Sequence, residues 1–296
     1  MRLFPILALL LAQDPVSGDA VIRSGSGKSE IVIRTTQRLA GAIDSLRWDG
    51  KEFIDSTDHG RQLQSASNLD AGSPISAETY NPTEAGSRDD GAGPKSSSVL
   101  LSLKAEGASL ETRTRMAFWL KPGEKSGPNF AKNTTVVSDH IVAKRVTIGF
   151  RDLPQVLDYS TTFTLPVVEK HAAATFEALT GYMPAEFSRF LVYDPATQEL
   201  KPLSDGPGEQ PLPVILSTPS GSHAMGIYSP DVPAPGYGRF RFEREKVVKW
   251  NCVFRIRKPE GFPPGDFAYR NFVAVGTLED VTASLRKLHG IFSAKR

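Results

Sequence analysis

The sequence has few of the residues that several classes of function require. It contains one cysteine among 296 residues, which excludes a disulfide framework and any metal or iron–sulfur site built from several cysteines. Lysine and arginine (35) nearly balance aspartate and glutamate (33), and a net charge of +2 lacks the basic excess of nucleic-acid binders. Beyond the first dozen residues no run of 18 apolar residues occurs, so we predict no membrane span.

Several motifs that bind nucleotides or activate nucleophiles are also missing. The chain has no Gly-x-Gly-x-x-Gly unit before a helix, no phosphate-binding loop and no Gly-x-Ser-x-Gly nucleophile elbow. Its five histidines are dispersed, with neither His-x-His nor His-x-x-x-His spacing. We therefore predict no metal site and no cofactor.

The first residues have the pattern of an export signal. Arg2 supplies a positive charge, and the apolar run from Leu3 to Ala12 follows it and ends at a small residue. This pattern predicts a signal peptide over residues 1–18 and an exported protein, either periplasmic or extracellular. The alternative is an apolar strand at the N-terminus.

Alternation of apolar and polar residues predicts strands along most of the remaining chain. Around Cys252, apolar side chains occupy every second position, which predicts a long half-buried strand with Cys252 in the core. Alternation on both sides of Gly107 predicts a hairpin. Further alternating stretches surround Ile31, Val146 and Tyr159.

One helix is predicted, at the C-terminal end. Thr277 and Asp280 suit a capping box at its start, and Gly290 is expected to end it. An apolar stripe runs between them, formed by Leu278, Val281, Leu285 and Leu288. The pattern predicts an all-β fold, a large two-sheet antiparallel sandwich with one C-terminal helix, in a single domain over residues 19–296. Length alone would also allow two domains.

Residues 41–54 (GAIDSLRWDGKEFI) combine a short strand, a turn at Asp49-Gly50 and a second apolar stretch. The Gly-Ala-x-x-x-Ser-Leu strand with its turn resembles the opening hairpin of galactose-mutarotase-like proteins. The resemblance implies their supersandwich fold, which also serves the C-terminal domains of many polysaccharide lyases and glycoside hydrolases. It further implies a sugar lying across a concave sheet face. The catalytic His and Glu of that family cannot be placed here by motif, so epimerase activity does not follow.

The densest polar run of the chain lies in its first third and provides candidate catalytic residues. If the segment is extended, His59 and Arg61 lie on one face, where an imidazole can carry a proton and a guanidinium can anchor a substrate. Glu78 or Glu84 could supply a carboxylate partner, and Tyr80 could stack on a sugar ring. The alternative is that these side chains only stabilise loops.

A second group of candidates lies further along the chain. His171 and Glu177 fall on one face of a predicted strand, separated by small residues that leave room for a ligand. His171 is a reserve catalytic candidate, Glu177 a substrate-binding one, and His223 a candidate at the rim of the site. Each could equally be a structural residue.

The outward face of the late hairpin predicts a basic stripe that would suit an anionic polysaccharide, formed by Arg239, Arg241, Lys249, Arg255 and Arg257. The alternative is an ordinary solvated sheet face.

These features lead to one hypothesis and one competitor. The first is an exported carbohydrate-binding protein that acts on an oligo- or polysaccharide as a lyase, glycoside hydrolase or epimerase. Its partner would be a carbohydrate, with an anionic one among the options, and not a nucleic acid. The competitor is a non-catalytic exported glycan-binding or structural module.

Overall fold

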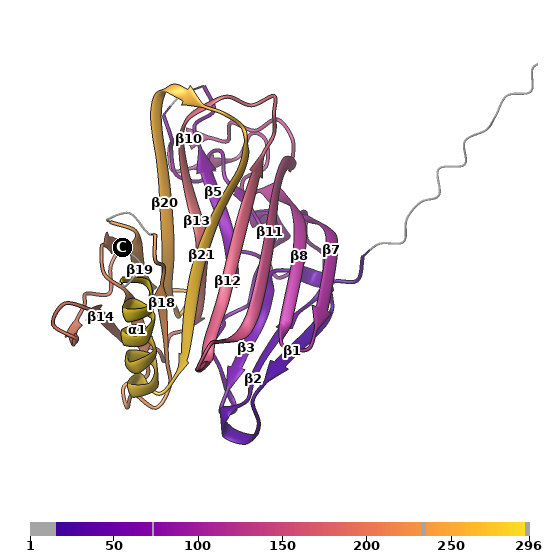
Figure 1. The fold of residues 1–296 in the computed structure, drawn as a ribbon. Coiled ribbons are helices and arrows are strands. Elements are labelled where there is room, and N and C mark those ends of the chain that lie inside the picture. The colour runs from indigo at the N-terminus through magenta and orange to yellow at the C-terminus, as the bar shows by residue number, and fades with distance from the viewer. Residues whose placement is uncertain (1–15, 73, 232–234, 294–296) are drawn as a thin grey trace, which may run out of the picture.

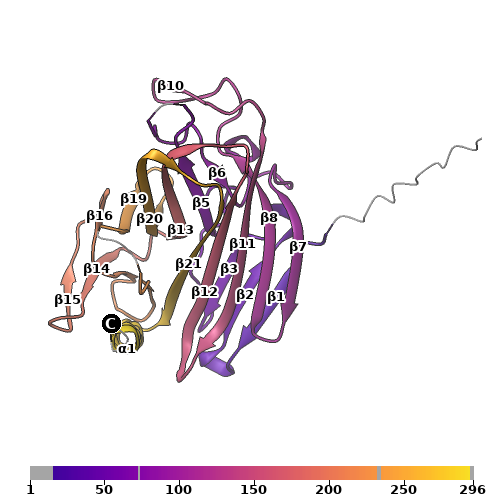
Figure 2. The same cartoon turned by 45° about the horizontal axis from the view of Figure 1, so that its top comes forward.

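Strands make up most of the chain, as the alternation of its residues predicts. The computed structural model describes residues 16–72, 74–231 and 235–293, and every strand pair within them is antiparallel. The strands pack as two layers with a single α-helix beside one of them (Figures 1 and 2). This confirms the predicted all-β sandwich. The predicted signal peptide falls largely on residues 1–15, which lie outside the described residues.

The first sheet has the strand order β7-β8-β11-β12-β21-β18-β17-β14-β15. Its strands are β7 (Val99–Glu106), β8 (Ser109–Phe118), β11 (Val137–Phe150), β12 (Leu153–Leu165), β21 (Gly265–Gly276), β18 (Ala224–Tyr228), β17 (Val214–Ser217), β14 (Arg189–Asp194) and β15 (Glu199–Pro202). The hairpin predicted around Gly107 is the β7–β8 pair.

The second sheet has the order β1-β2-β3-β5-β13-β20-β19-β16. Its strands are β1 (Ala20–Ser24), β2 (Ile31–Thr35), β3 (Ile43–Trp48), β5 (Leu63–Leu69), β13 (His171–Pro184), β20 (Val247–Phe262), β19 (Tyr237–Phe242) and β16 (Gly208–Gln210).

Shorter elements complete the fold. β6 (Pro82–Thr83) pairs with both β5 and β8 and so joins the two sheets. β9 (Lys125–Ser126) and β10 (Asn129–Phe130) form a separate small hairpin. Three short 3-10 helices occupy Gly27–Ser29, Gln37–Leu39 and Arg88–Asp90.

The core lies between the two sheets. Phe163 of β12 and Phe176 of β13 meet there with ring centroids 4.9 Å apart, and both side chains are buried. Trp250 and Cys252 of β20 are fully buried too, which confirms the predicted inward face of that strand. Burial raises the pKa of the Cys252 thiol, so it stays a neutral, apolar side chain.

The segment at residues 41–54, which resembles galactose-mutarotase-like proteins, forms a hairpin. β3 is followed by β4 (Lys51–Glu52), and the connecting Asp49 and Gly50 have φ angles of 45° and 73°. Positive φ at both central residues is the type I′ geometry that favours Asp-Gly, because glycine takes it without steric cost.

Helix α1 (Leu278–Ser293) packs on the outside of the first sheet, against β18 and β21. Its start confirms the capping box, since the backbone N–H of Asp280 donates to Oγ1 of Thr277 and that of Thr277 donates to the Asp280 carboxylate. The predicted end at Gly290 is wrong, because the helix continues through Ser293. Phe292 packs against Phe272 with centroids 5.2 Å apart, and this contact carries the helix past the glycine. Within the described residues, α1 lacks the length and apolar character needed to cross a membrane.

Candidate functional site

A cleft of about 280 Å³ lies on the outer face of the second sheet, close to the lower end of the range for small-molecule pockets, about 300 Å³. Its floor comes from β5, β13 and β20, and its walls come from residues 77–83 and Trp119. Alternation along β5 turns every second residue into it, so Gln64 and Asn68 line the cleft. The remaining polar side chains that matter here are Glu78, Asn81, Glu177 and Lys249.

A β-bulge in β13 places two polar side chains of the cleft together. The pairing of β13 with β20 runs from Glu177–Val253 to Leu179–Cys252, so Ala178 is an extra residue. Because of this extra residue, Glu177 and Thr180 share one face although they are three positions apart, and Thr180 Oγ1 donates to Glu177 Oε2 at 2.8 Å. The carbonyl of Ala178 accepts hydrogen bonds from Ser65 and Thr161. The bulge is therefore held from both sheets.

Glu177 and Lys249 form an ion pair in the cleft. Nζ of Lys249 lies 3.2 Å from Oε2 of Glu177, and the two side chains are 16% and 22% exposed. Burial alone would raise the pKa of Glu177, but the Lys249 ammonium and hydrogen bonds from Thr180 and Asn251 outweigh it and hold that pKa below its usual range. Burial opposes the charge of Lys249 as well, yet the Glu177 carboxylate raises its pKa. Both groups are thus charged at neutral pH.

Two aromatic rings line the cleft beside this ion pair. Lys249 Nζ lies 5.2 Å from the ring centroid of Tyr182, and burial raises the pKa of that phenol, so it keeps its proton. Trp119 lies over Gly60, where a Cβ atom would come within 2.7 Å of the indole. Glycine at position 60 is therefore required for the tryptophan to lie as it does. Such rings offer apolar faces against which the C–H face of a sugar packs.

His59 and Arg61 do not line one open cleft as predicted. His59 is 1% exposed, and its two ring nitrogens bond to the carbonyl oxygens of Gly91 and Arg38. Arg61 instead forms an ion pair with Asp58 at 3.1 Å. The local chain is a loop rather than an extended strand, which is why the two side chains diverge. The geometry gives His59 a structural role in tying loops together.

Glu84 is also buried rather than accessible. Its side chain is 1% exposed, and Oε1 accepts a hydrogen bond from Nζ of Lys144, which is itself fully buried. Its other oxygen accepts from the backbone N–H of Ser65 at 3.0 Å. An interior ion pair of this kind holds strands together and does not meet a substrate, so the predicted carboxylate role is left to Glu78, which does line the cleft.

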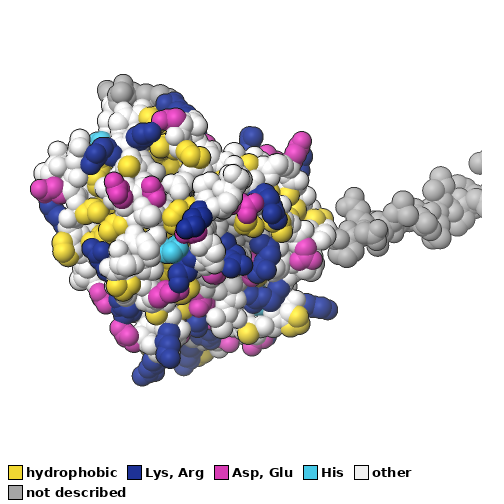
Figure 3. Space-filling view, turned by 90° about the horizontal axis from the view of Figure 1, so that it is seen from below, with side chains coloured by type: hydrophobic (Ala, Val, Ile, Leu, Met, Phe, Trp, Pro, Cys, Tyr) yellow, Lys and Arg dark blue, Asp and Glu magenta, His cyan; other side chains and the backbone are white. Residues whose placement is uncertain are grey.

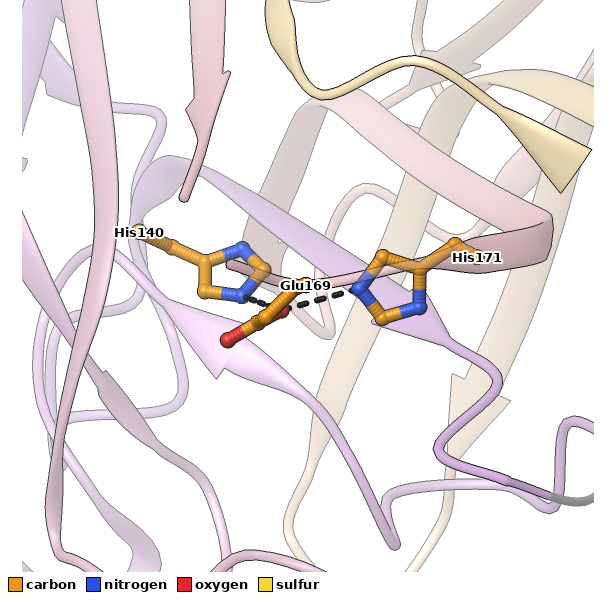
Figure 4. Close-up of side chains that lie close together, drawn as sticks. All are labelled: His140, Glu169 and His171. Atoms are coloured by element: carbon orange, nitrogen blue, oxygen red, sulfur yellow. Dashed lines mark hydrogen bonds and ion pairs between the residues drawn. The ribbon is translucent and has the colours of Figure 1, made fainter. Parts of the chain in front are cut away.

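His171 and Tyr80 belong to a different cluster, outside the cleft. In Figure 4 the rings of His140 and His171 lie on either side of Glu169, and both Nε2 atoms are 2.8 Å from its Oε2. The hydroxyl of Tyr80 donates to Oε1 of the same carboxylate at 2.9 Å, so Tyr80 points toward this cluster and not toward a sugar in the cleft.

His223 lies elsewhere in the fold. Its ring packs against Trp48 and Phe53, with centroids 5.5 and 6.1 Å away, and its Nδ1 bonds to Ser222. It is absent from the residues that line the cleft described above.

The predicted basic stripe does not form. Arg239 is paired with Trp250 and Arg241 with Val248, whereas Lys249 is paired with Phe240. Directly paired residues point to the same side of a sheet, so the two arginines and Lys249 lie on opposite faces. Arg241 forms an ion pair with Asp205 at 2.5 Å and Arg239 donates to the carbonyl of Ser204.

Figure 3 shows a face on which Lys and Arg side chains gather near the middle, with Asp and Glu side chains around them.

Two of the candidate residues from the sequence, Glu78 and Glu177, line the cleft, and most of the other lining residues were missed. Alternation with Trp250 and Cys252 places Lys249 on the outer face correctly, but grouping it there with Arg239 and Arg241 is wrong. Gln64 and Asn68 are not marked by alternation, because Ser65 and Ser67 between them are polar as well. Nothing in the sequence indicated that Trp119, on a distant segment, covers that face.

No protein-family model matches the chain, and no curated protein is significantly similar to it in sequence. Among solved structures, an α-mannosidase from Enterococcus faecalis V583 aligns with a TM-score of 0.54 and 11% identity, over 97% of this chain and 32% of that one. This chain shares its fold with part of a carbohydrate-active enzyme.

Other similar structures include a galactose mutarotase related enzyme from Lactobacillus acidophilus, with a TM-score of 0.48, 12% identity, and coverage of 88% of this chain and 98% of that one. A heparan sulfate lyase from Pedobacter heparinus aligns with a TM-score of 0.44 and 10% identity, over 88% of this chain and 36% of the lyase. The chain thus spans about a third of the length of the mannosidase and of the lyase. Galactose-mutarotase-like proteins are among the similar structures, as the hairpin at residues 41–54 led us to expect.

Proposed function

We propose that this protein binds a carbohydrate in the cleft over β5, β13 and β20. The observation that carries the proposal is the partly exposed ion pair of Glu177 and Lys249, set between amide side chains and the rings of Trp119 and Tyr182. A sugar hydroxyl can donate to the carboxylate and accept from the ammonium, and charge-assisted hydrogen bonds of this kind are about twice as strong as neutral ones. The fold shared with part of an α-mannosidase supports the same ligand class.

The charge of the cleft favours a neutral saccharide over an anionic one. The charged side chains among its lining residues are Glu78, Glu177 and Lys249, two acids and one base. The positive charge of Lys249 is already balanced by Glu177, so it attracts a uronate or sulfate group only weakly. Glu78 adds a negative charge that repels such a group. The anionic polysaccharide considered from the sequence is therefore the less favoured ligand.

The electrostatics favour binding over proton transfer. A general base or acid works best when its pKa lies near the working pH. Here the pKa of Glu177 is lowered, which makes it a weak base, and the pKa of Lys249 is raised, which makes it a weak acid. The pair is thus set as a permanent pair of charges, suited to holding hydroxyl groups. The lyase, hydrolase and epimerase activities considered from the sequence remain hypotheses.

The test is calorimetric titration of the purified protein with neutral oligosaccharides and with uronate-containing ones. We expect neutral glycans to bind, and Glu177→Gln to weaken binding at least tenfold, because a hydrogen bond to a charged group is worth about 1.5–3 kcal/mol. Glu209→Gln is the matched control, since Glu209 pairs with Arg255 outside the cleft lining. The proposal is refuted if Glu177→Gln and Glu209→Gln bind the glycan with equal affinity, or if the protein binds no glycan. Turnover of a bound glycan would favour the enzymatic hypothesis.

We also propose that the protein acts after export. The support is the charged and apolar pattern of residues 1–18. N-terminal sequencing of the protein from the periplasmic or culture fraction should give a start near residues 13–19. Full-length chain in the cytoplasmic fraction alone would contradict export.

A further inference from the structure

Three side chains from separate segments converge on one point at the end of the sandwich beside the loop that precedes β13 (Figure 4). His140 comes from β11, His171 opens β13, and Glu169 comes from the connecting loop. Their ligand atoms lie within 4.8 Å of one another, and the side chains of the two histidines are 2% and 4% exposed. Glu169 is 22% exposed, so the cluster opens to solvent only on the carboxylate side.

The hydrogen bonds of His171 determine which of its nitrogens faces Glu169. Nδ1 lies 2.6 Å from the backbone carbonyl oxygen of Asp70. A carbonyl only accepts, so Nδ1 carries a proton, and Nε2 faces Glu169 Oε2 at 2.8 Å, either with a second proton or with its lone pair. Two electron-pair donors face each other at this distance only when a cation lies between them, either a second proton or a metal ion.

We propose that His140, Glu169 and His171 bind a divalent transition-metal cation, with Zn²⁺ as the ion that best fits the donor set. Two imidazole nitrogens and one carboxylate oxygen form a three-ligand zinc set that leaves a fourth position for water. Zinc requires about 2.0–2.2 Å to each ligand atom, so atoms now 2.8 Å apart would separate by about half an ångström to sit around the ion. The solvent-facing side of Glu169 provides the open position.

Two of the three ligands, His171 and Glu169, have neighbouring groups of the kind that orient metal ligands. The carboxylate of Asp70 accepts hydrogen bonds from the backbone N–H groups of Ala172 and Ala173, which holds it against the His171 ring. Tyr80 donates to Oε1 of Glu169 and leaves Oε2 for the ion. Such partners orient ligands and their loss usually costs 10- to 100-fold in affinity.

The site would also brace one wall of the cleft. Tyr80 lies between Glu78 and Asn81, both of which line the cleft, and its hydroxyl is bonded to a proposed ligand. Metal binding would therefore hold residues 77–83 against the end of the sheet. This link to ligand binding rests on the proposed function, whereas the metal site itself does not.

The site runs against the expectation of no metal site, which came from histidine spacing. His140 and His171 are 31 positions apart, and only the folding of β11, β12 and β13 brings them to one end of the sandwich. Neither a local motif nor the alternation of residues marks such a pair.

The test is titration of chelator-treated full-length protein with ZnCl₂, in competition with a chromophoric chelator. We expect one Zn²⁺ per chain and a rise in Tm of about 5–10 °C at a free zinc concentration 100-fold above Kd. His140→Gln and His171→Gln should weaken binding at least 100-fold. His289→Gln changes a histidine on α1 whose ring is bonded to Ser293, far from the cluster in sequence; it is the matched control and should bind as the wild type does. Equal zinc affinity of all three variants would overturn the proposal.

A second measurement covers the case in which a variant does not fold. Wild-type crystals soaked in ZnCl₂ should give one strong anomalous peak at the zinc edge, between the Nε2 atoms of His140 and His171. The absence of a peak there, or a Kd weaker than about 10 µM for the wild type, would show that a proton and not a metal holds the cluster together. Glycan affinity with and without zinc then tests the link to the cleft separately, since zinc binding is measured with no glycan present.

Discussion

Replacing Glu84 by glutamine is expected to destabilise the protein strongly and to make its stability depend on pH. Lys144 is fully buried and donates to Glu84 and to the carbonyl of Gly41. Burial lowers the pKa of Lys144, and the Glu84 carboxylate offsets this only in part. Glu84→Gln removes the opposing charge, so the pKa of Lys144 falls further and the folded variant holds a neutral lysine.

The magnitude follows from the proton that the folded variant cannot keep. An unfolded lysine has a pKa of about 10.4. Keeping the side chain neutral costs about 1.4 kcal/mol for each pH unit below that value. For a folded pKa below 7, the cost at pH 7 is therefore about 4–5 kcal/mol. This agrees with the roughly 3–5 kcal/mol typical of breaking a buried ion pair and is a large part of the total stability of a domain.

The sign of the pH effect is fixed by proton binding. Between pH 7 and 10 the unfolded variant binds a proton on Lys144 that the folded variant lacks, so the free energy of unfolding of the variant rises with pH by about 1.4 kcal/mol per unit. The assay is urea unfolding followed by tryptophan fluorescence at pH 7, 8 and 9. Glu111→Gln, which removes a carboxylate from an exposed pair with Arg145, is the matched control and should unfold as wild type does.

A double variant separates the charge from the shape of the pair. Glu84→Gln combined with Lys144→Met removes both charges, and we expect it to be more stable than Glu84→Gln alone. If Glu84→Gln unfolds at the wild-type urea concentration, or shows no added pH dependence, then Lys144 and Glu84 are not coupled as described and the structural role of Glu84 is refuted.

Two further outcomes are expected. Thr277→Ala removes the capping hydroxyl of α1 and should lower the free energy of unfolding by about 1 kcal/mol, measured by urea denaturation. An unchanged urea midpoint would mean that the cap does not stabilise the helix. Cys252 should resist a thiol reagent at pH 8 in the native protein, because its side chain is buried and burial raises the pKa of its thiol. In urea it should react rapidly. Rapid labelling of the folded protein would contradict the position of Cys252 in the core.

Local sequence patterns were enough to predict the strands, the helix cap and the outer or inner position of several side chains. Alternation is a local property, and it placed Cys252 in the core and Glu177 on an outer face correctly because each strand exposes every second residue. The Asp49-Gly50 turn was predictable for the same reason, since a tight turn depends on the conformations of two adjacent residues.

Which of these side chains meet depends on how the strands pair and pack. Lys249 reaches Glu177 because β20 pairs with β13, and the bulge at Ala178 turns Thr180 toward the same carboxylate. His140 and His171 converge through the order of strands, and Glu84 is buried against Lys144 of β11. Contacts between residues distant in the chain depend on strand order and register, which no local pattern encodes.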